Sequence, residues 1–415
     1  MHSRSLVFRH SGDCHLARLP SSQGVPSSAP LVVAQPRGLE ADTTAGVPAI
    51  PPSAVPQQTR RTRFVCISDT HNCTVKLPKG DVLIHCGDLT NQGSFSELSK
   101  QVRWLEKADF ECKLVIAGNH DLTLDTAFYE QFGAYFHNNA PQNPINCQDL
   151  FTKSNSLTYL LHGSRTIKLA SPSGPHTTFS VFGSPYTPEY GQWAFQYSRK
   201  GSAGDEIWKD IPLDTDILVT HGPAHTHTDE AKNRAAAGCE SLRQAMWRVR
   251  PRLALCGHIH EARGVERVRW DLDSKSVKYK ELSDVFEWLD PGEGNNKNSL
   301  ADLTAKGGRP LENDGHRAPA DTPQTSWTSH ATGMECGGDK GVSPGIGTRG
   351  LSGSPESARS DQAALAGRLG RKETCIVNCA IQSTGYPHSG PRRLNKPIVV
   401  DLDLPVWEDD FPCPS

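Results

Sequence analysis

The chain lacks any run of apolar residues approaching the roughly 20 that a membrane-spanning helix needs. It also lacks a charge imbalance, since 44 Lys and Arg residues stand against 46 Asp and Glu residues, and this balance disfavours nucleic acid and anionic lipid as partners. The first 20 residues contain several arginines but no continuous apolar segment, so they do not resemble a secretory signal. We therefore expect a soluble, cytoplasmic protein with no membrane partner; organelle targeting by the Arg-rich N-terminus is the alternative.

The 12 cysteines include no Cys-x-x-Cys pair, and their spacing does not indicate a disulfide framework. Four of them lie inside or at the ends of apolar, strand-like runs: Cys66, Cys86, Cys112 and Cys256. A thiol in such a run behaves as a small buried hydrophobic group. This usage is typical of a reducing compartment.

Hydrophobic residues make up only 36% of the chain, and the shortage is concentrated in two segments. Residues 1–60 hold 8 of the 30 prolines, and residues 291–370 hold 15 of the 36 glycines. Because neither segment has enough apolar surface to offset the entropy of ordering, we expect a disordered tail and a disordered low-complexity insertion. Residues 61–290 should form one domain that residues 371–415 complete, since the latter are too few to fold alone.

Short apolar runs alternate with two helical segments in the rest of the chain. Strands are expected at 63–68, 81–88, 113–121, 158–170, 177–186, 215–223, 251–260, 262–270, 374–381 and 396–405. Helices are expected at 94–108 and 239–249, where apolar residues recur at helical spacing. This order predicts an α/β fold with a largely buried sheet.

Metal-type ligands follow five of these strands. In chain order they are Asp69 and His71, Asp88, Asn119 and His120, His221, and His258 and His260. Ligand sites in α/β sheets lie beyond the carboxyl ends of the strands, and oxygen and imidazole donors together suit one or two divalent cations. Turn residues that merely close strands are the alternative interpretation. Any one pair arises by chance, but the ordered series predicts a metal site.

The motif order D-x-H, G-D, G-N-H-D, a lone H and G-H-x-H resembles that of the calcineurin-like metallophosphoesterases. The sequences around the motifs, among them ISDTHN, AGNHD and CGHIHE, are similar to the metallophosphoesterase-domain-containing (MPPED-like) branch. The resemblance covers about residues 63–290 and 374–405. It implies a four-layer α/β/β/α sandwich, with two sheets between layers of helices.

The resemblance also implies two divalent metal ions, of which Mn²⁺, Fe²⁺ or Fe³⁺, Mg²⁺ and Zn²⁺ are the candidates, and in-line attack of a metal-bridging hydroxide on a phosphoester. It assigns Asp69, His71 and His260 to one metal, Asn119, His221 and His258 to the second, and Asp88 to both. His120 would be the catalytic residue that protonates the leaving oxygen. Substrate contacts would come from Asn91, Asn119 and His120.

Two positions depart from the family pattern, because Asn91 and Gln92 stand where many relatives carry Asp and Arg. The missing charges favour phosphodiesters, such as cyclic nucleotides, over phosphoproteins. The sequence therefore predicts a hydrolase, a metal-dependent phosphodiesterase acting on small-molecule phosphoesters. The alternatives are a phosphomonoesterase or phosphoprotein phosphatase of the same chemistry and a nucleotide-binding scaffold of low activity. A nuclease is disfavoured by the near-neutral charge.

Other residues near the motifs have plainer interpretations. We expect His225 and His227 to be solvated loop residues and His85 to be a core histidine. The aromatic side chain of Trp193 is expected in the core or packing a lid, with stacking on a nucleobase as the alternative. The strand at 262–270 is expected to expose its basic side chains.

Overall fold

The structure, a computed structural model, describes residues 58–271, 281–282, 286–312, 371–385 and 393–407. These residues belong to one compact unit, Ala54–Ser415. The expected tail at 1–60 lies almost wholly outside the described residues, as does the expected insertion from residue 313 onward. None of the described helices is long and apolar enough to cross a membrane.

The first of two large sheets has six strands in the order β13-β15-β1-β2-β3-β4. Its strands are β1 (Thr59–Ile67), β2 (Val82–Cys86), β3 (Cys112–Ile116), β4 (Thr158–Tyr159), β13 (Ser299–Leu303) and β15 (Ile398–Pro405). All neighbouring pairs are parallel except β1 and β15. Parallel strands covered on both faces must be apolar on both, and β2 accordingly is buried at every residue.

The second large sheet has seven strands in the order β12-β11-β14-β10-β9-β6-β5. Its strands are β5 (Gly163–Lys168), β6 (Thr178–Ser184), β9 (Ile217–Thr220), β10 (Leu253–Cys256), β11 (Gly264–Arg269), β12 (Phe286–Glu287) and β14 (Glu373–Asn378). The central strands β6, β9, β10 and β14 run parallel, and the outer pairs are antiparallel. A small third sheet pairs β7 (Thr187–Pro188) with β8 (Gln196–Tyr197).

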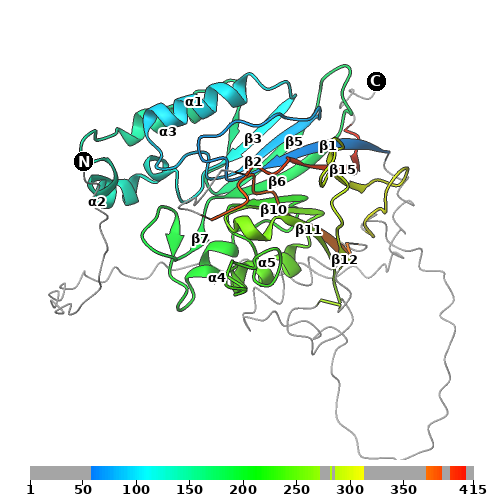
Figure 1. Cartoon of the computed structure of the whole chain (residues 1–415). Helices are drawn as coiled ribbons and strands as arrows, with labels where there is room; N and C mark the ends of the chain where they lie inside the picture. Colours follow the sequence, from blue (N-terminus) through cyan, green and yellow to red (C-terminus); the bar gives the residue numbers. More distant parts are fainter. Residues whose placement is uncertain (1–57, 272–280, 283–285, 313–370, 386–392, 408–415) are drawn as a thin grey trace, which may run out of the picture. The chain divides into compact units, whose positions relative to one another are not determined.

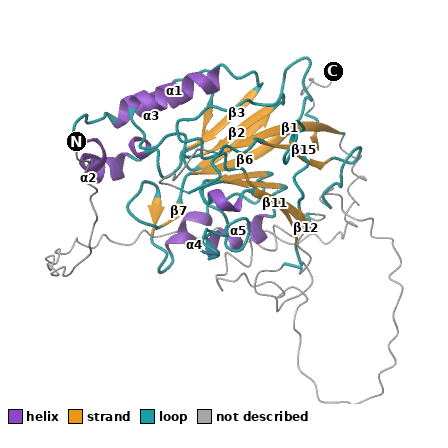
Figure 2. Ribbon diagram, viewed as in Figure 1, coloured by secondary structure: helices purple, strands orange, loops and turns teal. Residues whose placement is uncertain are grey.

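Helices cover the outer face of each large sheet (Figures 1 and 2). Over the first sheet lie α1 (Phe95–Glu106), α2 (Thr126–His137) and α3 (Pro144–Thr152); over the second lie α4 (Ala203–Trp208) and α5 (Glu240–Val249). The helix predicted at 94–108 begins at a capping box formed by Ser94 and Glu97, which satisfies the amides at the start of α1. The predicted helix at 239–249 is α5.

Three hydrophobic clusters confirm the four-layer α/β/β/α arrangement. The cluster between the two sheets packs Phe64, Ile84, Val181, Val219 and Leu255. The cluster under α1–α3 joins Leu98 and Leu105 to Leu83, and the cluster under α4 and α5 joins Trp208 and Met246 to Leu218. Because alternate residues of one strand face opposite layers, central strands such as β2 and β9 contribute to two of these clusters.

The C-terminal segment supplies one interior strand to each sheet. β14 lies between β10 and β11, and β15 lies between β13 and β1. The expectation of disorder from residue 291 onward is wrong for Ser299–Leu303. These residues form β13, which pairs with β15 and buries alternate residues. This five-residue strand is too short to raise the apolar content of an 80-residue Gly-rich window, so composition alone missed it.

Candidate metal centre

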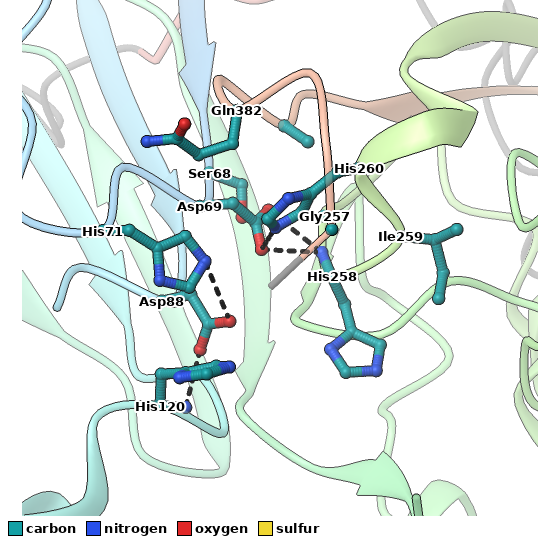
Figure 3. A network of polar contacts seen from close by, with 12 residues as sticks. Ser68, Asp69, His71, Asp88, His120, Gly257, His258, Ile259, His260 and Gln382 are labelled. Carbon is teal, nitrogen blue, oxygen red and sulfur yellow. Dashed lines mark hydrogen bonds and ion pairs between the residues drawn. The ribbon is translucent and has the colours of Figure 1, made fainter. Parts of the chain in front are cut away.

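The candidate ligands lie where strands of both large sheets end (Figure 3). Asp69 and His71 follow β1, Asp88 follows β2, and Asn119 and His120 follow β3; His221 follows β9, and His258 and His260 follow β10. The second sheet thus contributes three histidines to a site whose acidic residues come from the first. The structure brings together all the residues that the sequence analysis proposed as ligands.

The first cluster of donor atoms comprises Asp69, His71 and His260, all of which are buried. One donor atom from each lies within 4.8 Å of the others. The Nε2 atom of His260 lies 3.2 Å from Oδ1 of Asp69. The same carboxylate accepts hydrogen bonds from the backbone N–H of His258, so it connects the ends of β1 and β10.

The second cluster comprises Asp88, His221 and His258, again within 4.8 Å of one another. The Nε2 atom of His221 lies 2.9 Å from Oδ1 of Asn119 and 3.3 Å from Oδ2 of Asp88. The imidazole of His221, which follows a strand of the second sheet, therefore faces two oxygens from loops of the first sheet. This placement adds Asn119 to the second set of donors.

Asp88 lies between the two clusters. Its Oδ2 atom is 3.7 Å from Nε2 of His71, which belongs to the first cluster, and 3.3 Å from Nε2 of His221, which belongs to the second. Its Oδ1 atom accepts a 2.8 Å hydrogen bond from the backbone N–H of His120. That hydrogen bond orients the carboxylate so that Oδ2 faces His71 and His221; Figure 3 shows the contacts of Asp88 with His71 and His120.

Backbone carbonyls fix the orientation of the imidazoles. The Nδ1 atoms of His71, His221 and His260 lie 3.1, 2.8 and 2.6 Å from the carbonyl oxygens of Thr90, Cys86 and Thr384, respectively. A carbonyl can only accept, so each Nδ1 carries the proton. The Nε2 atoms are then left to face the centre as ligands, as in histidine metal sites generally. The sequence analysis missed these carbonyls, because a backbone acceptor has no residue signature.

Charges within the site shift the pKa values of its members in opposite directions. Burial alone would lower the pKa of His221, but the nearby carboxylates of Asp88 and Asp69 raise it to about 9. Burial dominates at His71 and His258 and lowers the pKa of each to about 3. Burial would raise the pKa of Asp88, yet the surrounding histidines hold it well below its usual range. The site thus keeps its carboxylates ionised, as cation binding requires.

The backbone around the centre adopts unusual conformations. Asp69, His71, Asp88 and His258 have φ values of 54°, 41°, 53° and 66°. Each non-glycine residue in this left-handed region costs about 1–3 kcal/mol, and such residues persist only where the surroundings hold them. Gly118 shows how tight those surroundings are, because a Cβ atom there would overlap the backbone nitrogen and carboxylate of Asp88.

Asp121 holds two ligand-bearing loops together. Its Oδ1 atom accepts hydrogen bonds from the backbone N–H and the hydroxyl of Thr90, at 3.0 and 2.7 Å. Its Oδ2 atom accepts from the backbone N–H groups of Gly118 and Leu89. Burial and the nearby charge of Asp88 raise the pKa of Asp121 to about 7. Its place is therefore behind the ligands, joining the loop after β2 to the loop after β3.

His120 lies beside the donors and is held on three sides. Its Nδ1 atom is 2.9 Å from the backbone carbonyl oxygen of Asn91, so the main chain, rather than the Asn91 side chain, orients the ring. The ring of His71 packs edge-on against the His120 ring, with ring centroids 4.9 Å apart. The indole of Trp193 lies over the His120 ring, with ring centroids 4.0 Å apart. The sequence analysis placed Trp193 in the core or a lid and did not link it to His120.

The expected environments of the neighbouring histidines agree with the structure for His85 but not for His227. His85 is a buried core histidine, as expected, and its Nε2 atom contacts the hydroxyl of Thr70. His227, expected to be solvated, is instead only 2% exposed and lies between the carboxylates of Glu266 and Glu281. His225 is 33% exposed at its side chain and lies 3.7 Å from Asp229. Neither His225 nor His227 belongs to the two donor clusters.

The donor set fits divalent cations. Asp69 and Asp88 are buried carboxylates, and the ion pairs they form among the described residues are to histidines rather than to Lys or Arg. Buried carboxylates require a compensating positive charge, which bound cations would supply. Imidazole nitrogens mixed with carboxylate and amide oxygens, without a thiolate, suit Mn²⁺, iron, Zn²⁺ or Mg²⁺.

Comparison with known proteins agrees with this chemistry. A sequence profile described as "Calcineurin-like phosphoesterase" matches residues 10–262. The chain is 39% identical over 222 residues to the human and mouse proteins named "Metallophosphoesterase domain-containing protein 1", covering 52% of this chain and 65% of each relative. It is 42% identical over 218 residues to "Probable rhamnogalacturonate lyase C" of Emericella nidulans, covering 52% of this chain and 19% of that protein.

The chain therefore spans only part of the length of these curated relatives, which limits the comparison to the matched region. In the matched region, the loops that carry the two donor clusters contain the D-x-H, G-D, G-N-H-D and G-H-x-H motifs. The profile match covers more than half of the chain, and the chain belongs to the calcineurin-like phosphoesterase family.

Proposed function

We propose that this protein is a dinuclear metal-dependent phosphoesterase that prefers phosphodiesters, cyclic nucleotides among them. The observation that carries the proposal is the position of Asp88, whose Oδ2 atom faces a histidine of each donor cluster at 3.7 and 3.3 Å. A carboxylate shared between two sets of ligands is what a pair of adjacent cations requires.

The chain's own residues would divide the work as follows. Asp69, His71 and His260 would hold one cation, Asn119, His221 and His258 the other, and Asp88 both. When bound, the two cations supply Lewis acidity toward the phosphoryl oxygens and an activated water. His120, oriented by the carbonyl of Asn91, would donate a proton to the departing oxygen from Nε2.

The preference for diesters rests on charge. A phosphomonoester brings two negative charges and a phosphodiester one, so monoester sites usually add an arginine or lysine to the cations. Gln92 occupies the position where many relatives carry Arg, and the described ion pairs of Asp69 and Asp88 are to histidines. Asn91 and Asn119 would contact the substrate as neutral groups.

Hydrolysis of bis-p-nitrophenyl phosphate and p-nitrophenyl phosphate by metal-stripped protein, titrated with Mn²⁺, tests the proposal. We expect diester cleavage that depends on metal and is lost in Asp88→Asn and His120→Ala. Asp149→Asn is the matched control, because Asp149 is a surface residue of α3 that pairs with Lys153.

The outcomes separate the alternatives. A preference for the monoester would indicate a phosphomonoesterase or phosphoprotein phosphatase. Binding of two metals without cleavage of either ester would indicate a nucleotide-binding scaffold. Full activity of Asp88→Asn would contradict the site assignment itself.

We further propose that residues 61–290 and 371–415 form a single catalytic domain located in the cytoplasm. The interior positions of β14 and β15 support the first point, because removing them would split both sheets. The second is supported by nine described cysteines that are all free thiols, most of them buried.

A further inference from the structure

Trp193 is attached to the loop that carries His120. The backbone N–H of the next residue, Ala194, donates to the carbonyl of Asn119 at 3.2 Å. The backbone N–H of Phe195 donates to Oδ2 of Asp125, whose Oδ1 accepts from Phe128 at the start of α2. These hydrogen bonds fix the main chain that directly follows Trp193. Backbone hydrogen bonds on the C-terminal side of Trp193 therefore stabilise the position of its indole on His120.

The same indole lines a pocket of about 460 Å³ between α2 and residues 189–198. Phe128 and Phe132 of α2 and Tyr197 of β8 contribute further aromatic walls. Phe136, one helical turn beyond Phe132, packs against Trp193 with ring centroids 5.5 Å apart. Trp193 is thus the residue that belongs both to this pocket and to the surroundings of His120.

We propose that Trp193 is a specificity-determining residue, whose indole forms the wall of a subsite for a planar aromatic group attached to the substrate phosphorus through the leaving oxygen. This inference rests on the proposed function, because the phosphoryl group must bind at the candidate metal centre. The subsite lies on the leaving-group side, since Trp193 contacts the residue that would protonate the leaving oxygen.

The chemistry of the pocket supports an aromatic occupant. Aromatic rings favour offset or edge contacts with other rings, and each such pair adds to the area that is buried. The described residues that line the pocket include the carboxylate of Glu189 but no Lys or Arg. A second phosphate or a carboxylate in this subsite would therefore be repelled. The expected group is uncharged, or positively charged, and flat.

Binding of non-hydrolysable phosphonates to Mn²⁺-loaded protein tests this inference by calorimetry without requiring turnover. The probes are inorganic phosphate, methylphosphonate and benzylphosphonate, whose methylene stands in for the ester oxygen. We expect benzylphosphonate to bind about tenfold more tightly than methylphosphonate, as aromatic contacts of this kind allow. Trp193→Ala should remove that preference, and Trp193→Phe should restore most of it.

Two controls keep the result interpretable. Inorganic phosphate should still bind to both Trp193 variants, because Trp193 is not part of either donor cluster, and this binding shows that the metal centre is intact. Tyr190→Ala should behave as the wild type, because Tyr190 lies in the same loop but is 77% exposed and does not line the pocket. If phosphate itself fails to bind, the proposed function is wrong. If phosphate binds but Trp193→Ala keeps the benzyl preference, the subsite is wrong.

A kinetic readout adds to the binding data. For bis-p-nitrophenyl phosphate, Trp193→Ala should raise KM and lower kcat, because the variant loses both the subsite wall and the contact that holds His120. Trp193→Phe should recover kcat more fully than KM, since a smaller ring can still stack on the imidazole. An equal effect of both variants on phosphodiesters with aromatic and alkyl groups would contradict the specificity role.

Discussion

The Nδ1 atom of His120 lies 2.9 Å from the backbone carbonyl oxygen of Asn91. Because the acceptor belongs to the main chain, the contact does not depend on which side chain stands at position 91. The resemblance to the family implies an acidic side chain at this position that would orient the histidine. In this protein a backbone carbonyl contacts the imidazole, so the role proposed for His120 does not require an acidic side chain at position 91.

Replacing Asn91 should therefore affect substrate binding more than the chemical step. We expect Asn91→Ala to keep kcat within about threefold of the wild type and to raise KM, because its side chain is assigned to substrate contact. His120→Ala should lower kcat by about 10²–10⁴, the usual contribution of a general acid. Steady-state kinetics with Mn²⁺-loaded protein measures both. A loss in Asn91→Ala as large as in His120→Ala would show that the side chain, not the carbonyl, orients the ring.

Gly118 should be irreplaceable for metal binding. A Cβ atom at this position would overlap the carboxylate and backbone nitrogen of Asp88 and the ring of His221, so Gly118→Ala must move a residue of the second donor cluster. We expect fewer than two Mn²⁺ ions per chain by mass spectrometry and loss of diester cleavage.

Gly163→Ala is the control for this substitution, because no heavy atom outside its chain neighbours lies within 4 Å of the added Cβ. It should bind the same amount of metal as the wild type. Normal metal content in Gly118→Ala would show that the donors can shift without losing the cations.

Glu281 should stabilise the fold within a defined pH range. Burial alone would raise its pKa, but Arg243 and His227 outweigh burial and lower the pKa from 4.5 to about 2. A carboxyl whose pKa falls on folding stabilises the fold above its ordinary pKa, and the contribution disappears as the pH falls toward the folded value. His227 has a pKa raised above 6.5 by Glu266 and Glu281, so its contribution disappears as the pH rises through that raised value.

The difference in Tm between the wild type and Glu281→Gln should accordingly be largest between pH 4.5 and 6.5. This difference should decrease as the pH falls below 4.5 and as it rises above 6.5. Thermal unfolding of metal-stripped protein across pH 3–8 measures this Tm difference. The pH range extends roughly 1.5 units below the ordinary pKa of Glu and above that of His. Glu206→Gln, an exposed residue paired with Lys209, should give a small difference at every pH. A Tm difference for Glu281→Gln that does not vary with pH would mean that packing, not charge, accounts for it.

The sequence predicted the family and the residues gathered at the centre because short local motifs encode both, and the four-layer fold followed from the family resemblance that these motifs carry. Asp69, Asp88 and His258 directly follow apolar strands, and the ends of such strands meet at one edge of a sheet. Their roles as ligands stay predictions, although the structure brings their donor atoms together.

What the sequence did not reveal depends on contacts between distant segments. His227 lies in a polar run that reads as solvated, yet Glu266 and Glu281, 39 and 54 positions further along, enclose it. The carbonyl of Thr384 orients His260 across 124 residues of sequence. No spacing or periodicity carries such information, because partners of this kind are chosen by the tertiary fold.

Arg267 was expected on an exposed face, and its burial leads to a stability prediction. It is only 4% exposed, because β11 pairs with β14 and residues 309–310 cover its guanidinium. It donates to the buried carboxylate of Glu373 at 2.6 Å. Removing Arg267 leaves the buried Glu373 carboxylate with the longer, 3.7 Å contact to the more exposed Arg269. Because breaking a buried pair is costly, Arg267→Ala should lower the free energy of unfolding by up to about 3–5 kcal/mol.

Urea denaturation measures this change, and Arg61→Ala is the control. Arg61 is 61% exposed and lies 4.0 Å from Asp401, so its removal should cost only about 0–1 kcal/mol. The double variant Arg267→Met, Glu373→Met should recover much of the loss, because two apolar side chains leave no unpaired charge in the same space. If Arg267→Ala were no more harmful than Arg61→Ala, water would have to reach Glu373, and the burial described for this pair would not hold in solution.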